Sequence, residues 1–252
     1  MLSVAIIAKD EARHIGAALD SVAGLAGERL VLLDARTCDD TAAICSAHGA
    51  RVVVEPWRGF AAQRNRALEL CTHAWVLFLD ADERVTPELR DEIGHVLAAD
   101  VGKPAGYWIP RHNQFFGRVL RGGGWYPDHQ LRLLRRTSAH YDEARPVHEF
   151  AELSGPAGYL SEHLLHLNIE RLDELWHKQR AYAVQEAQML FRAGRRARWR
   201  NFAGAPAREF FRRYVRLRGW RDGPIGLLMC ATLAYFEIVK FAHLQGLERA
   251  VR

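Results

Sequence analysis

The chain is most informative near its middle, where it reads Trp75-Val76-Leu77-Phe78-Leu79-Asp80-Ala81-Asp82-Glu83. An unbroken apolar run of this length, with no alternation of polar and apolar positions, is typical of a strand buried on both faces of a parallel sheet. Ligands of such sheets bind beyond the carboxyl ends of the strands. Because two unpaired charges would be costly in the core, we expect Asp80 and Asp82 to lie at that ligand-binding edge.

Two carboxylates one residue apart indicate a particular kind of ligand. Mg²⁺ and Mn²⁺ take hard oxygen ligands, usually one or two protein carboxylates together with phosphate oxygens and water. The Asp-x-Asp pair therefore predicts a binding site for Mg²⁺ or Mn²⁺ in complex with a diphosphate. The alternative is a strand that ends in two solvated loop acids, and the other parts of the chain have to decide between these interpretations.

The first hundred residues alternate short apolar runs with helix-like stretches, a pattern that indicates crossover units and a parallel sheet. The apolar runs are 2–8, 30–33, 52–54 and 75–79. Three of them end in an acid, namely Asp34, Glu55 and Asp80. A negative rim favours a metal or a hydroxyl-rich ligand. The loop after the first run lacks the glycine spacing of a dinucleotide-binding turn, which disfavours a nicotinamide or flavin cofactor.

The rest of the chain changes character twice. Two further strands are expected at 107–109 and 130–135, separated by a glycine-rich and aromatic segment, and the chain is helical from about residue 150 to its end. Trp125 and Tyr126 in that segment could stack on a sugar ring or could plug the core. We expect a catalytic domain over 1–165, with a nucleotide-sugar half at 1–100 and an acceptor half at 101–165, followed by a helical extension over 166–252.

Charge is unevenly distributed. The stretch 192–221 holds eleven arginines and one acid, Glu209, although the net charge of all 252 residues is only +5. Such an asymmetry predicts an anionic partner surface, either nucleic acid or the cytoplasmic face of a membrane. No module or interleaving of aromatics typical of nucleic-acid readers is present, so no nucleic-acid partner is expected.

The last apolar run, 225–236, meets Glu237 and Lys240 before it reaches the usual spanning length. We therefore expect an interfacial helix, peripheral on the inner face of a bacterial inner membrane. A helix packed on the catalytic domain or in a dimer is the alternative. Four cysteines without metal-ligand or disulfide spacing, and no recognisable export signal, favour the cytoplasm.

Four segments, in this order, resemble family 2 glycosyltransferases of the GT-A fold. They are Val4–Glu11, Asp34–Thr41, Gly59–Leu68 and Leu79–Glu83. Ala35, Arg36 and Cys38 stand where the family usually has small polar residues. Within the family, the chain is most similar to bacterial lipopolysaccharide-core β-glucosyltransferases, through Gly124–Leu133, Val147–Glu149 and Asp222–Gly226. The resemblance implies an α/β fold with a mostly parallel, Rossmann-like sheet flanked by helices and a C-terminal helical extension.

The resemblance also implies roles for individual residues. It places Lys9, Glu11, Asp34, Arg64 and Asp80 around the donor, Asp82 and Asp80 on the metal, and His166 at the diphosphate or metal. Glu149 is the implied catalytic base and Asp128 is its rival.

The expected reaction is the inverting transfer of a hexose, with glucose as the expected sugar, from a nucleotide sugar to a lipid-linked acceptor such as the lipopolysaccharide inner core. UDP is the expected nucleotide of the donor. Three alternatives stay open: a polyprenyl-phosphate glycosyltransferase, a protein glycosyltransferase, and a non-catalytic protein that binds anionic lipid or RNA on the same scaffold.

Overall fold

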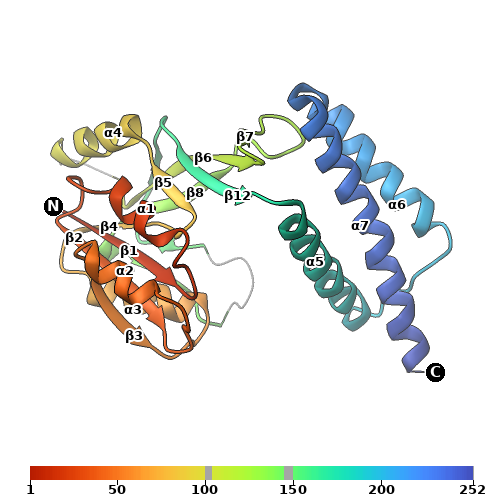
Figure 1. Ribbon diagram of the computed structural model, residues 1–252, viewed down its shortest axis with the longest axis horizontal. Coiled ribbons are helices and arrows are strands. Elements are labelled where there is room, and N and C mark those ends of the chain that lie inside the picture. The colour runs from red at the N-terminus through yellow and green to blue at the C-terminus, as the bar shows by residue number, and fades with distance from the viewer. Residues whose placement is uncertain (100–103, 145–149, 252) are drawn as a thin grey trace. The chain divides into compact units, whose positions relative to one another are not determined.

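A computed structural model describes residues 1–99, 104–144 and 150–251. Its contacts divide the chain into two compact units (Figure 1). The first, which we call the sheet unit, holds residues 1–111 and 128–166, and the second, the helical unit, holds residues 112–127 and 167–252. The domain limits expected at 165 and 166 stay a prediction. The contacts add that the segment 112–127 belongs with the C-terminal helices.

The sheet runs in the order β3-β2-β1-β4-β8-β6-β12-β5, and its first half is parallel. The parallel strands are β1 (Leu2–Ala8), β2 (Glu28–Asp34), β3 (Arg51–Glu55) and β4 (Trp75–Phe78). Beyond β4 the pairing turns antiparallel with β8 (His129–Arg135) and β6 (Gly106–Phe115). The shorter strands are β5 (Glu83–Val85), β7 (Arg118–Val119), β9 (Ala139–His140), β10 (Glu152–Leu153), β11 (Ala157–Tyr159) and β12 (Leu164–Ile169).

Helices cover both faces of this sheet. One apolar cluster joins alternate residues of β1 and β4, such as Trp75 and Leu77, to α1 (Ile15–Ser21), α2 (Thr41–Ala47) and α4 (Pro87–Ala98). The residues between them, Val76 and Phe78, join the cluster that contains α3 (Phe60–Leu70) on the other face. The expectation of a strand buried on both faces is therefore confirmed, and so is the α/β fold class.

The helical unit consists of α5 (Leu172–Arg192), α6 (Asn201–Phe210) and α7 (Gly223–Ala250), and both α5 and α6 pack on α7. A π-helical turn, Phe211–Arg216, and a 3₁₀ turn, Gly219–Asp222, connect α6 to α7. Among the described residues, one helical stretch, Gly219–Ala250, is long and apolar enough by length and composition to cross a membrane. Its Lys240 is ion-paired with Glu237 and, at 3.0 Å, with Glu186. The expected interfacial helix stays a prediction.

The glycine-rich segment docks within the helical unit. Asp222, which precedes α7, accepts hydrogen bonds from the backbone N–H groups of Arg121 (2.9 Å) and Gly122 (2.7 Å). Any β-carbon on Gly122 would meet the carbonyl oxygen of Arg218 at 2.2 Å, so only glycine allows this approach. Trp125 packs on Phe115, with ring centroids 4.7 Å apart, and lies under the Arg213 guanidinium. For Trp125 the packing interpretation is therefore the one that the structure supports.

Candidate active site

Asp80 comes two residues after the end of β4 and lies beside an arginine of the neighbouring strand β8. Arg132 of β8 is only 3% exposed and donates to both Asp80 oxygens, the Nη1–Oδ1 distance being 3.2 Å. The Arg64 guanidinium of α3 lies 3.9 Å from Asp80 Oδ1. Partial removal from water opposes ionisation of Asp80, but the charges of Arg132 and Arg64 outweigh it and hold the pKa of Asp80 below its usual range. Asp80 is therefore a carboxylate with two cationic neighbours.

The ion pairs continue away from Asp80. Glu83, which is fully buried, accepts hydrogen bonds from Arg132 (3.2 Å) and from Arg111 of β6 (3.0 Å). Arg111 also donates twice to Asp128 Oδ2, at 2.9 and 2.7 Å. Each buried charge thus has a partner of opposite sign, which is the condition under which charges are tolerated in a protein interior. The result is a five-residue ionic network from Asp80 to Asp128.

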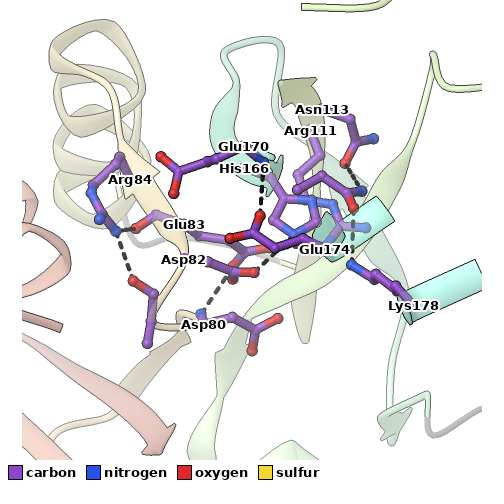
Figure 2. Close-up of polar contacts among 12 residues, drawn as sticks. Asp80, Asp82, Glu83, Arg84, Arg111, Asn113, His166, Glu170, Glu174 and Lys178 are labelled. Atoms are coloured by element: carbon purple, nitrogen blue, oxygen red, sulfur yellow. Dashed lines mark hydrogen bonds and ion pairs between the residues drawn. The ribbon is translucent and has the colours of Figure 1, made fainter. Parts of the chain in front are cut away.

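Asp82 points to a different partner. Its Oδ2 lies 3.2 Å from Nε2 of His166. Figure 2 shows the two side chains. His166 is on β12, which pairs antiparallel with β5 so that His166 stands opposite Glu83. Among the described residues, no group of three or more His, Cys, Asp or Glu side chains is arranged to hold a metal ion. Asp82 and His166 therefore form a two-residue donor set.

Glu11, in the loop after β1, adds to the negative charge of this region. Its backbone N–H donates to Thr41 Oγ1 at 2.8 Å, which fixes the loop against the start of α2. Burial, and after it the charges of Asp82, Asp39 and Asp80, together raise the pKa of Glu11 to about 7. Carboxylates that repel one another in this way favour a bound cation.

Asp34, at the end of β2, forms an ion pair with a residue of the loop that follows it. Arg36 donates to both of its oxygens, with an Nη2–Oδ2 distance of 2.6 Å, and lowers the pKa of Asp34 to about 2. Lys9 pairs with Asp10 at 2.8 Å, and Asp10 in turn accepts from the backbone N–H of Cys38. The loops after β1 and β2 are therefore joined, and the atypical Arg36 is the partner of Asp34.

The structure brings several of the predicted residues together. Asp80 with Arg64, and Asp82 with His166 and Glu11, gather near the end of β4, and Asp128 is connected to them through the ionic network. Glu149 lies outside the described residues. The roles given to all these residues stay predictions.

Sequence reasoning missed the three members of the network that lie between Asp80 and Asp128, namely Glu83, Arg111 and Arg132. For Arg132 there was a signal. It interrupts the apolar run of β8, where Leu131, Leu133 and Leu134 are buried. An arginine inside a buried strand needs a carboxylate partner, and the acids after β4 were the available ones.

Helices on both faces of this sheet, together with an Asp-x-Asp pair at the end of its central strand, agree with the GT-A class of glycosyltransferases that the motifs resemble. Residues 3–138 match the family model described as glycosyl transferase family 2. The chain belongs to this family, and the resemblance inferred from its motifs is confirmed.

Comparison with known proteins gives more detail. The chain is 31% identical over 254 residues to the lipopolysaccharide core biosynthesis glycosyltransferase LpsC of Rhizobium meliloti (strain 1021), a match that covers 96% of this chain and 91% of LpsC. It is 41% identical over 98 residues to an uncharacterized glycosyltransferase of Rickettsia felis, covering 39% of this chain and 34% of that protein. Among solved structures, glucosyl-3-phosphoglycerate synthase from Mycobacterium tuberculosis in complex with phosphoglyceric acid has a TM-score of 0.48, 22% sequence identity, and coverage of 77% of this chain and 80% of that chain.

Proposed function

We propose that this family 2 glycosyltransferase is an inverting, metal-dependent enzyme that moves a hexose, with glucose preferred, from a UDP-sugar to a lipid-linked saccharide. The observation that carries the proposal is the pairing of Asp82 with His166 beside two further acids, Asp80 and Glu11. Four groups that can bind a cation or a hydroxyl-rich donor gather at the end of the central strand, where ligands of such sheets bind.

The residues present fit Mg²⁺ or Mn²⁺. Asp82 and His166 would hold the ion, and the remaining positions suit donor phosphate oxygens and water, because Mg²⁺ is usually bound through only one or two carboxylates plus substrate phosphates. When bound, the ion supplies charge neutralisation to the leaving diphosphate. Asp80 is already paired with Arg132, so we place it beside the ribose and sugar, with Asp82 as the direct ligand.

The rest of the donor site follows from the charges already described. Arg64 would approach the phosphates of the donor. Asp34 would accept a hydrogen bond from the base or ribose after the Arg36 side chain moves off its carboxylate. Lys9 and Glu11, in the loop after β1, would also lie beside the donor nucleotide.

For the base we propose Glu149 rather than Asp128. Both Asp128 oxygens accept hydrogen bonds, one from Arg111 and the other from Gln130 at 2.7 Å, and these bonds stabilise the carboxylate and weaken it as a proton acceptor. Glu149 would take the proton of the acceptor hydroxyl, whose oxygen forms the new bond to the anomeric carbon as the diphosphate leaves from the opposite side. This single displacement inverts the configuration.

The acceptor is proposed from similarity and charge. LpsC is a lipopolysaccharide core biosynthesis glycosyltransferase, and the lipopolysaccharide inner core is an anionic, membrane-bound saccharide. The arginine-rich helical unit suits such an acceptor at the cytoplasmic face of the inner membrane.

The test is slow hydrolysis of a panel of sugar nucleotides in the presence of Mg²⁺ or Mn²⁺. We expect UDP-glucose to be hydrolysed. We expect Asp82→Asn to reduce the hydrolysis rate by at least roughly 10–100-fold, the loss that mutation of a residue hydrogen-bonded to a metal ligand typically causes. Asp91→Asn, on the exposed side of α4, is the matched control and should leave the rate unchanged. Equal activity in the Asp82 and Asp91 variants, or no donor turned over by wild type, would contradict the proposal.

A further inference from the structure

The loop between α5 and α6, residues 193–200, concentrates positive charge at one place in the helical unit. Its arginines 195, 196, 198 and 200 line an open pocket of about 590 Å³, together with Asn201 and Glu248. The pocket therefore has four guanidinium groups and one carboxylate in its lining. Such a composition suits an anionic ligand with several phosphate oxygens.

These four guanidinium groups have no hydrogen-bonded or ion-paired carboxylate within the part of the chain that the structure describes. Glu248, the acid of the pocket, instead accepts from the backbone N–H of Ala197 at 2.6 Å. By contrast, Arg212 and Arg213 of the same unit both pair with Glu209. The loop is thus a local excess of uncompensated charge.

The loop and the adjoining end of the chain also carry apolar groups that a soluble anion would not need. Trp199, between Arg198 and Arg200, is 87% exposed, and Val251, in the adjoining pocket, is 75% exposed. A tryptophan flanked by arginines suits the boundary between head-groups and acyl chains, where the ring enters the apolar layer and the cations meet phosphates.

Exposed apolar side chains elsewhere in the helical unit favour a bilayer over a nucleic acid. Ile238 of α7 and Val251 just beyond it, towards the end of the helix that meets the loop, are both exposed. Aromatic rings and arginines could serve either partner, because bases stack on rings. Exposed aliphatic side chains gain by entering a bilayer and offer nothing for a base to stack on.

We infer that the α5–α6 loop is the membrane-contact site of this enzyme, with the four arginines on the phosphate head-groups of an anionic bilayer and Trp199 inserted beside them. The inference rests on the proposed function, because it locates on particular residues the membrane partner that the proposal assigns to the helical unit.

The test is flotation of the full-length protein, at physiological salt, with vesicles of phosphatidylcholine alone or mixed with phosphatidylglycerol. Wild type should float with the mixed vesicles only. Changing the four loop arginines to glutamine should weaken binding at least about tenfold, because one arginine near an anionic surface contributes about a factor of five. Trp199→Ala, at a position too exposed to matter for folding, should weaken binding severalfold.

The matched control changes Arg118, Arg180, Arg216 and Arg221 to glutamine, which removes the same charge from exposed positions of the helical unit outside the loop. It should retain binding, because charges more than about 8 Å from the contact are largely screened at this salt concentration. Equal loss in the control, no flotation of wild type, binding of inorganic phosphate alone, or binding of a single-stranded RNA oligonucleotide in place of vesicles would each overturn the inference.

UDP-glucose hydrolysis without vesicles, measured on the same samples, separates the two proposals. Hydrolysis without vesicle binding contradicts the membrane-contact site alone. Loop-dependent vesicle binding without hydrolysis contradicts the proposed enzyme activity and supports the contact site.

Discussion

At the scale of single residues, the site depends on one buried arginine. Arg132 lies between Asp80 and Glu83, and both carboxylates raise its pKa against the opposing effect of burial. Its neighbour Arg111 behaves in the same way between Glu83 and Asp128. A fully buried Glu83 is tolerable only because both cations contact it.

Replacing Arg132 by methionine should therefore destabilise the protein strongly. The change leaves Glu83 with one cation, and removing one partner of a buried ion pair costs about 3–5 kcal/mol. Combining it with Glu83→Gln should recover part of that loss, because both buried charges are then gone. Urea unfolding measures the effect, and the exposed Arg180→Met is the control, expected to change stability by less than about 0.5 kcal/mol. If Arg132→Met lowers the free energy of unfolding no more than the control does, the Arg132–Glu83 ion pair contributes little to stability.

Glu11 makes stability depend on pH. Its pKa of about 7 in the folded chain lies above the ordinary value of 4.5, so between these values the folded state binds a proton that the unfolded state has lost. Stability should consequently fall as pH rises from 4.5 to 7. Because Glu11 is only half-buried, we expect a loss of about 1 kcal/mol after allowing for solvent screening.

The measurement is unfolding of wild type and Glu11→Gln at pH 5 and pH 8 in a metal chelator. The stability of Glu11→Gln relative to wild type should increase between the two pH values, whereas for the exposed control Glu88→Gln it should not. A relative stability of Glu11→Gln that is the same at pH 5 and pH 8 would rule out this titration.

At the scale of secondary-structure elements, the start of α7 holds the glycine-rich segment through Asp222. Two backbone N–H groups donate to this carboxylate, and hydrogen bonds to a charged group contribute about 1.5–3 kcal/mol each. The position of the segment therefore depends on a residue about a hundred positions later in the chain.

Asp222→Ala should speed hydrogen exchange at the amides of Arg121 and Gly122, because both lose their acceptor. Asp222→Asn retains one acceptor oxygen and should show a smaller effect. Exchange measured by NMR or mass spectrometry resolves the two variants, and amides of β1 in the sheet unit serve as an internal control. Unchanged exchange at 121 and 122 in the alanine variant would mean that other contacts hold the segment.

At the scale of the whole molecule, much of the fold could be predicted because its signals are local. The apolar run Trp75–Leu79 indicated a strand buried on both faces, and alternating strands and helices indicated the parallel half of the sheet. The antiparallel half was only partly predicted. The expectation that the chain is helical from about residue 150 was wrong, because β10, β11 and β12 precede α5. Short strands, such as β5 and β12, have little pattern of their own and exist because a neighbouring strand supplies their hydrogen bonds.

The sequence by itself determined the family, the α/β class and the Asp-x-Asp pair at the end of the central strand, since these are properties of contiguous residues. The tertiary structure alone decided the partners of that pair. Asp80 contacts Arg132, 52 positions later, and Asp82 contacts His166, 84 positions later. Ion pairs at such separations depend on strand order and register, because β8 lies beside β4 and β12 beside β5, and no local pattern encodes that order.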